Sequence, residues 1–250
     1  MTISIAVALL ILISLAAFFA FKTKRFFYPV APPMPAEVTK PVTEILSQLE
    51  SILKAKVPQV LEAMQPGLSE EQIAALEQKD GIMIPDDIKA LYKWHNGCRI
   101  SDVNGSNYLI DGPIPAHRFM PLDEAMATAQ SMRREVAEAP MLQRIFFNVF
   151  AGHRKNWICL FDDGCGDGYF YDPERKPVDG SVFYCFAEVN NYVFFPSVNN
   201  LMAGIVKCYE EDAFTWKGGK DNVRLVEDFE RAAKIWQEFG VDSESQKWRQ

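Results

Sequence analysis

An uncharged apolar run near the N-terminus constrains this chain more than any other feature. The segment from Thr2 to Phe21 has no charged side chain. A helix of this length rises about 30 Å, which matches the hydrocarbon thickness of a bilayer. A cleaved signal peptide is the main alternative, but it needs positive charge before the apolar run and small residues at the cleavage site. Phe18, Phe19 and Phe21 stand there instead. The run therefore predicts an uncleaved transmembrane anchor over residues 2–21.

Three cations follow the predicted anchor, and no charged side chain precedes it. They are Lys22, Lys24 and Arg25. Because basic residues stay on the cytoplasmic side of a membrane, we expect the N-terminus outside and the soluble domain in the cytoplasm. The chain has five cysteines, an odd number with no C-x-x-C pair. This cysteine usage fits reduced thiols in a cytosol-like compartment. The predicted location is therefore that of a single-pass membrane protein.

A basic stop and a proline-rich spacer are predicted over residues 22–41. Prolines exclude helix and favour an extended conformation that can hold a domain roughly 40 Å from the membrane. The whole chain has 26 basic and 33 acidic residues, a formal net charge of −7. This acidic balance argues against binding to a nucleic-acid backbone. Without the three cations the rest of the chain is still more acidic, so an anionic membrane surface should repel it. The spacer would then hold the acidic domain away from the membrane surface.

The rest of the chain indicates helices first, strands in the middle and helices last. Apolar residues recur at helical spacing over residues 42–64, and Pro58 bends or ends that helix. A capping-box pattern at Ser69 and a proline with acidic residues at Pro85 predict two further helix starts. His95 is expected in the last turn of the second of these helices, which Asn96-Gly97 closes.

The spacing of apolar residues along the rest of the chain predicts the later helices and strands. Helices are expected over Asp123–Ala137, Val198–Glu211 and Asn222–Phe239. Strands are expected at Ile145–Phe150, Trp157–Phe161, Gly168–Asp172, Ser181–Phe186 and Tyr192–Phe195, with a hairpin at Asn104-Gly105. The turns are too short for parallel crossovers. The predicted fold class is α+β, with a single mainly antiparallel sheet and flanking helices, preceded by one N-terminal transmembrane helix.

Two blocks of the chain carry a family resemblance. Leu68–Gly97 reads LSEEQIAALEQKDGIMIPDDIKALYKWHNG, and Trp157–Pro173 reads WICLFDDGCGDGYFYDP. In this order and spacing the blocks resemble the SUKH superfamily, which contains the yeast cell-wall-assembly regulator homology domain and many bacterial toxin-immunity proteins. The residues that match the family's opening pattern are Ile73, Leu76, Glu77, Pro85, Asp86, Asp87, Leu91, Asn96 and Gly97.

The resemblance implies an α+β domain, predicted over residues 66–211, with a C-terminal helix and tail over 212–250. It implies a non-catalytic role in which the domain binds another protein, often a toxin, or acts as a regulatory adaptor. An acidic domain suits a basic partner, because opposite fields speed encounter. We therefore expect a membrane-anchored protein-binding module of immunity type, and no enzyme or cofactor. A regulatory scaffold for signalling or envelope assembly is the alternative.

An acidic turn is the sharpest candidate for chemistry. A metal-assisted hydrolase that uses Asp162, Asp163, Asp167 and Asp172 is the second alternative function. A calcium loop of EF-hand type counted from Asp163 would place Cys165 at a ligand position and strands where helices are needed. Paired carboxylates for glycoside hydrolysis lack a sugar-binding signature nearby. The structural interpretation is that glycine supplies positive φ and aspartate caps the turn.

Other candidate groups are weaker. The three histidines have no zinc-ligand spacing. A nucleophilic pair of Cys98 or Cys159 with His153 stays formally open, although Cys159 alternates with apolar residues as a buried side chain does. The aromatic stretch from Phe183 to Phe195 is either the packed face of the sheet or a contact surface. Trp94 is likewise core or contact. The predicted partner-binding residues are Trp94, Asn96, Asp162, Asp163, Asp167 and Asp172.

Overall fold

A computed structural model describes residues 35–99, 112–138, 157–173, 181–185, 192–218 and 224–240. The chain falls into two compact units, Met1–Met34 and Pro35–Gln250, and every described residue belongs to the second. Within these ranges no helix has the length and apolarity needed to cross a bilayer. The predicted anchor at residues 2–21, the Asn104-Gly105 hairpin and the strand Ile145–Phe150 lie outside the described residues.

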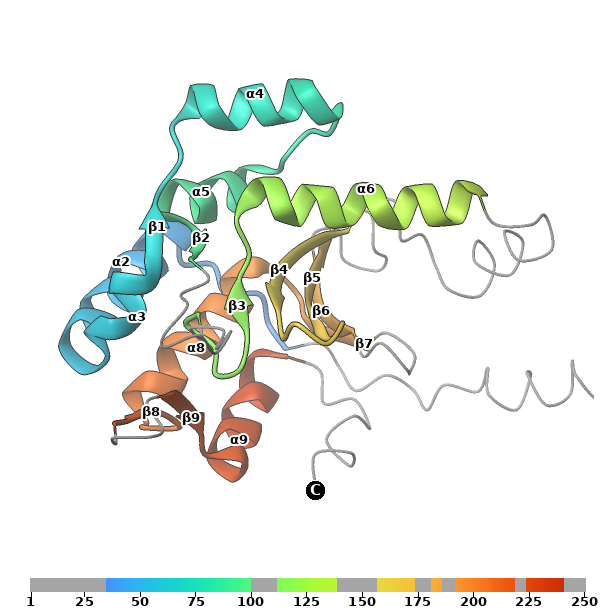
Figure 1. Cartoon of the computed structure of the whole chain (residues 1–250). Helices are drawn as coiled ribbons and strands as arrows, with labels where there is room; N and C mark the ends of the chain where they lie inside the picture. Colours follow the sequence, from blue (N-terminus) through green and yellow to red (C-terminus); the bar gives the residue numbers. More distant parts are fainter. Residues whose placement is uncertain are drawn as a thin grey trace, which may run out of the picture. The chain divides into compact units, whose positions relative to one another are not determined.

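Groups of helices and groups of strands alternate along the described part of the chain (Figure 1). The described helices are α2 (Val42–Lys56), α3 (Pro58–Ala63), α4 (Glu70–Asp80), α5 (Asp86–Trp94), α6 (Leu122–Glu138), α8 (Val198–Glu210) and α9 (Phe229–Phe239). The described strands are β1 (Met64–Pro66), β2 (His95–Cys98), β3 (Arg118–Phe119), β4 (Ile158–Asp162), β5 (Gly168–Asp172), β6 (Ser181–Cys185), β7 (Tyr192–Phe195), β8 (Phe214–Lys217) and β9 (Arg224–Glu227).

The main sheet has five strands in the order β3-β4-β5-β6-β7, and every neighbouring pair is antiparallel. In its centre Tyr169 pairs with Tyr184, and Phe170 pairs with Phe183. This confirms the predicted α+β fold with an antiparallel sheet. The prediction of a single sheet is wrong, because the described residues also form the two-stranded sheets β1-β2 and β8-β9. Both extra sheets join strands of four residues or fewer, which give a weak periodic signal in sequence.

The C-terminal helix is shorter than the sequence predicts. A helix was expected over Asn222–Phe239, but Arg224–Glu227 is the strand β9, paired with β8. The helix α9 starts after Asp228, whose side chain accepts a hydrogen bond from the backbone N–H of Arg231 at 3.1 Å. Phe229, the first residue of α9, is 61% exposed. The strand pairing and the Asp228 cap together override the helical spacing of the apolar residues.

The helix α8 lies at the centre of the core. Nine of its 13 residues are buried, and it contacts α2, α9 and the strands β6 and β7. The helix α2 presents Ile45, Leu46, Leu49 and Leu53 as its buried face. It ends before Pro58, which occupies the first turn of α3, as the sequence predicted. The predicted domain boundaries at 42–64, 66–211 and 212–250 stay predictions.

A series of aromatic rings runs through the core, from α5 across the main sheet to α8 and α9. Successive ring centroids lie 5.2–6.4 Å apart. The rings in this series are Tyr92, Phe119, Phe161, Tyr169, Phe195, Trp236, Phe214 and Tyr209. Phe183, Tyr184 and Phe195 are all buried. These three rings of the aromatic stretch are therefore core and not a contact surface.

Two glycines with left-handed backbone give a matched test of the packing. Gly97 has φ +73, and a Cβ there would lie 2.4 Å from the backbone nitrogen of Pro121. Gly81 has φ +63 and open space around it. We expect Gly97→Ala to lower the free energy of unfolding by about 3 kcal/mol, because the start of α6 must move. Gly81→Ala should cost only about 1 kcal/mol. Urea unfolding measures both, and equal losses would contradict the close approach.

Candidate functional site

Trp94 lies at a corner where α2, α5 and the β1-β2 sheet meet. Its Nε1 donates to Glu50 Oε2 at 2.9 Å, and His95 Nε2 lies 3.1 Å from the same oxygen. His95 Nδ1 lies 2.9 Å from the carbonyl oxygen of Gln65. The prediction that His95 lies in the last helical turn is wrong, because α5 ends at Trp94 and His95 begins β2. The carboxylate of Glu50 thus fixes the half-buried indole of Trp94 next to α2.

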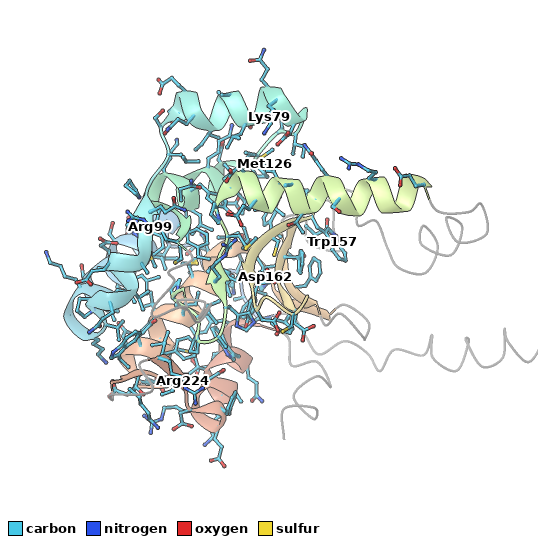
Figure 2. All side chains as sticks on the ribbon, in the orientation of Figure 1. Lys79, Arg99, Met126, Trp157, Asp162 and Arg224 are labelled. Carbon is cyan, nitrogen blue, oxygen red and sulfur yellow. The ribbon has the colours of Figure 1, made fainter. Side chains whose placement is uncertain are left out.

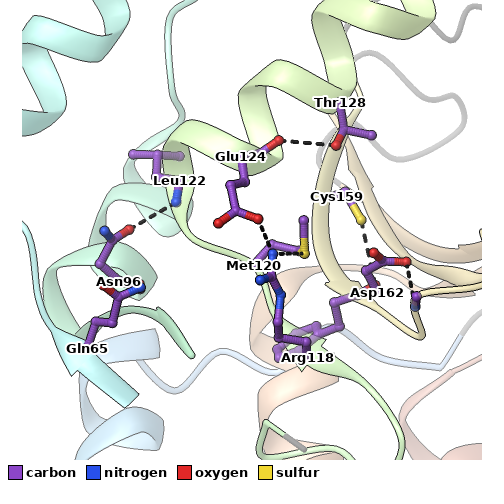
Figure 3. A network of polar contacts seen from close by, with 11 residues as sticks. Gln65, Asn96, Arg118, Met120, Leu122, Glu124, Thr128, Cys159 and Asp162 are labelled. Carbon is purple, nitrogen blue, oxygen red and sulfur yellow. Dashed lines mark hydrogen bonds and ion pairs between the residues drawn. The ribbon is translucent and has the colours of Figure 1, made fainter. Parts of the chain in front are cut away.

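Asn96 joins two elements instead of facing solvent alone. Its side-chain oxygen accepts a hydrogen bond from the backbone N–H of Leu122 at 2.9 Å, at the first residue of α6 (Figure 3). Its backbone oxygen accepts from Gln65 Nε2 at 3.1 Å. The sequence placed Asn96 at a helix end, but it lies within β2. The contact with Leu122 gives Asn96 a structural role at the start of α6.

The acidic turn between β4 and β5 is organised by its own carboxylates. Asp162 Oδ1 accepts from the N–H of Gly164 at 3.1 Å. Asp163 Oδ1 accepts from the N–H groups of Cys165 at 2.8 Å and Asp167 at 2.9 Å. Gly164 has φ +78, as the structural interpretation of the turn predicted. Strands flank the turn on both sides, so its surroundings differ from those of an EF-hand.

Asp172 lies at the far end of β5 from this turn. It is buried, and its Oδ2 accepts a hydrogen bond from Trp157 Nε1 at 2.7 Å. Figure 2 shows Trp157 and Asp162 at opposite ends of β4. Because β5 runs antiparallel to β4 for five residues, about 13 Å of strand separates Asp172 from the turn. The structure therefore divides the four predicted aspartates into a surface turn and a buried partner of Trp157.

The next candidates are the predicted metal ligands and the pair of Cys98 or Cys159 with His153. Among the described residues, no group of three or more His, Cys, Asp or Glu side chains is placed to hold a metal ion. Cys98 and Cys159 are buried, and His153 lies outside the described residues. Buried cysteines of this kind behave as small apolar side chains.

Sequence analysis missed a buried arginine beside the acidic turn. Arg118 lies on the edge strand β3, directly opposite Asp162 of β4. Its guanidinium forms an ion pair with Glu124 of α6 and donates to Met120 Sδ at 3.2 Å (Figure 3). The side chain of Arg118 is 6% exposed and that of Glu124 is 48% exposed. No local pattern marks this pair, because it joins the two-residue strand β3 to the first turn of α6.

A second concentration of negative charge lies on α4 and the start of α5. Residues 69–87 contain six carboxylates and one lysine. Ser69 forms the predicted capping box with Gln72. The pKa of Glu77 is lowered by the hydrogen bond from the backbone N–H of Ile84, at 2.7 Å, and by Lys89. Burial raises the pKa of Asp87. The segment presents an acidic surface, and the carboxylate of Glu77 fixes the α4–α5 loop.

The acidic turn generates a stability prediction. Asp163→Ala removes the acceptor of two backbone N–H groups, and we expect it to lower the free energy of unfolding by about 1–2 kcal/mol. Asp163→Asn keeps a side-chain oxygen, so it should lose less than half as much. Chemical denaturation of both variants measures the difference. An equal loss would show that the charge of Asp163 matters, and not its turn geometry.

Glu77 generates a pH prediction. Its pKa is lower in the folded chain than the ordinary value of 4.5, so its stabilising effect is complete above that value and is lost as pH falls through the folded pKa. We expect Glu77→Gln to be less stable than the parent chain by about 1 kcal/mol at pH 7. The gap should close as the pH falls below 4.5 and through the lowered pKa of Glu77 in the folded chain. A gap that persists at low pH would contradict a contribution from the charge.

The fold and these contacts define an α+β domain whose predicted site residues mostly hold its own backbone in place. Residues 67–204 match the family model of the SMI1 / KNR4 family (SUKH-1). Since the match covers more than half of the chain, the chain belongs to this family. The resemblance drawn from Leu68–Gly97 and Trp157–Pro173 is thus confirmed. No curated protein matches the chain.

Proposed function

We propose that the chain is a membrane-anchored, non-catalytic protein-binding module of immunity type. It neutralises or tethers a protein partner at the cytoplasmic face of the membrane. The family match over residues 67–204 carries the proposal. Domains of this family are generally non-catalytic immunity or regulatory modules that bind protein partners. The binding residues themselves stay a prediction.

Charge supports a basic partner. The chain has a net charge of −7, and two groups of its described carboxylates lie on α4–α5 and in the β4–β5 turn. Opposite fields speed encounter between two proteins and discriminate against partners of the wrong charge. Glycines and Cys165 at the tip of the turn are exposed, so a partner can approach its backbone closely. We place the contact at this turn, with Asp162, Asp163 and Asp167 as its carboxylates.

The sequence supports the membrane location. The apolar run Thr2–Phe21 has the length of a membrane span, and the cations after it favour a cytoplasmic domain. An anchor of this kind confines the module to two dimensions. It thereby raises the local concentration of the module for a partner that acts at the same membrane.

The alternatives differ in what they require of the site. A regulatory scaffold for signalling or envelope assembly uses the same fold and the same anchor with a different partner. A metal-assisted hydrolase needs Asp162, Asp163, Asp167 and Asp172 around one cation. The bond of Asp172 to Trp157 at the far end of β5 weighs against that arrangement.

Crosslinking and mass spectrometry of the full-length protein in its native membrane test the proposal. We expect crosslinks to a basic protein. A double variant, Asp162→Asn with Asp167→Asn, removes two charges from the turn and keeps one side-chain oxygen at each position, and it should reduce the crosslinks severalfold. The control, Glu62→Gln with Glu230→Gln, removes two exposed charges from α3 and α9 and should change little.

Three outcomes contradict parts of the proposal. Crosslinks only to assembly factors, with no basic effector, favour the regulatory scaffold. Equal loss in the turn variant and its control moves the contact away from the β4–β5 turn. Turnover of a small molecule by the purified protein, abolished by Asp163→Ala, favours the hydrolase.

A further inference from the structure

The segment from Ala36 to Lys40 is bound to the first turn of α8 by two consecutive asparagines. The backbone N–H of Val38 donates to Asn200 Oδ1 at 3.0 Å, and Asn200 Nδ2 donates to the carbonyl of Ala36 at 3.1 Å. Asn199 Nδ2 donates to the carbonyls of Val38 at 3.2 Å and Lys40 at 2.9 Å. We call residues 36–40 the strap. Side-chain amides hold it, and no strand pairing is involved.

Asn200 also binds the end of α9. Its Nδ2 donates to the carbonyl of Phe239, the last residue of that helix, at 3.1 Å. Its Oδ1 also accepts from the hydroxyl of Ser197 at 2.9 Å. The side chain of Asn200 is fully buried. Both donor positions and both acceptor positions of its carboxamide are therefore used.

All four hydrogen-bonding positions of the buried Asn200 amide are occupied. The backbone groups that it binds are therefore coupled to one another. If the strap leaves α8, Asn200 loses one acceptor and one donor at a buried position, where unsatisfied polar groups are costly. The amide must then turn toward water or another partner, and this disturbs its remaining bond to Phe239. By linkage, loosening the end of α9 weakens the strap by the same factor.

We propose that Asn200 is a latch that couples the strap at residues 36–40 to the C-terminal end of α9. The strap is where the chain enters the compact unit from its N-terminal side. A pull on the strap, or a partner that displaces it, therefore releases the end of α9, although the strap and Phe239 are about 200 residues apart in sequence. Asn199 holds the strap alone and takes no part in this coupling.

Hydrogen exchange of the full-length chain in detergent tests the latch from the strap side. The amide of Gly240, which donates to the carbonyl of Trp236 at 2.8 Å, reports on the end of α9. Val38→Pro removes the N–H that binds Asn200, whereas Val38→Ala shortens the side chain and keeps that N–H. We expect Gly240 to exchange about tenfold faster in Val38→Pro than in Val38→Ala. Equal exchange in the two variants would overturn the proposal.

Hydrogen exchange of variants at the two asparagines tests whether Asn200 couples the strap to α9 while Asn199 binds the strap alone. Asn200→Ala should speed exchange at both Val38 and Gly240 about tenfold. Asn199→Ala should loosen the strap and leave Gly240 within about twofold of the parent chain. Faster exchange at Gly240 in Asn199→Ala, as large as in Asn200→Ala, would show a general loosening and contradict the latch. If Asn200→Ala does not fold, the Val38 pair still decides the question.

Discussion

The buried helix α8 organises the packing of the elements around it. Its side chains form the centre of the core, and polar groups from other elements close both of its ends. At the first turn, Asn200 binds the strap and α9. Directly after the last turn, Lys56 of α2 forms an ion pair with Asp212 at 2.7 Å, and Arg231 of α9 donates to the carbonyl of Glu211, the C-cap residue, at 2.7 Å. Because helix ends leave backbone groups unsatisfied, these contacts fix α2 and α9 at the same time as they complete α8.

This construction leaves the acidic β4–β5 turn and the α4–α5 loop to face outward. The central strands bury aromatic rings, so their side chains serve packing. The β4–β5 turn and the α4–α5 loop instead use carboxylates to hold backbone N–H groups. A rigid scaffold with shaped, charged loops is a common way to build a recognition surface. The family to which the chain belongs binds protein partners, and this division of roles suits that function.

Local signals explain what the sequence could predict. The strands at Gly168–Asp172 and Tyr192–Phe195 have the bounds expected of them, since their aromatic runs are flanked by turn residues. The capping box at Ser69 was predicted for the same reason. The strand β9 was missed because its pairing with β8 competes with helical spacing over the same residues. The bonds from Glu50 to Trp94 and from Asn200 to Ala36 join residues 44 and 164 positions apart, and no short pattern encodes them. Of the predicted site residues, the turn aspartates are grouped as expected, whereas Asn96 and Asp172 serve the fold.

We propose that an acidic protein-binding domain works from the cytoplasmic face of a membrane, to which the N-terminal run Thr2–Phe21 anchors it. Intact mass and protease accessibility of the protein in oriented native membrane vesicles test this most directly. We expect an unprocessed chain that stays with the membrane after alkaline washing, with the domain digested only when the cytoplasmic face is exposed. A soluble, exported chain that lacks the apolar run would contradict it.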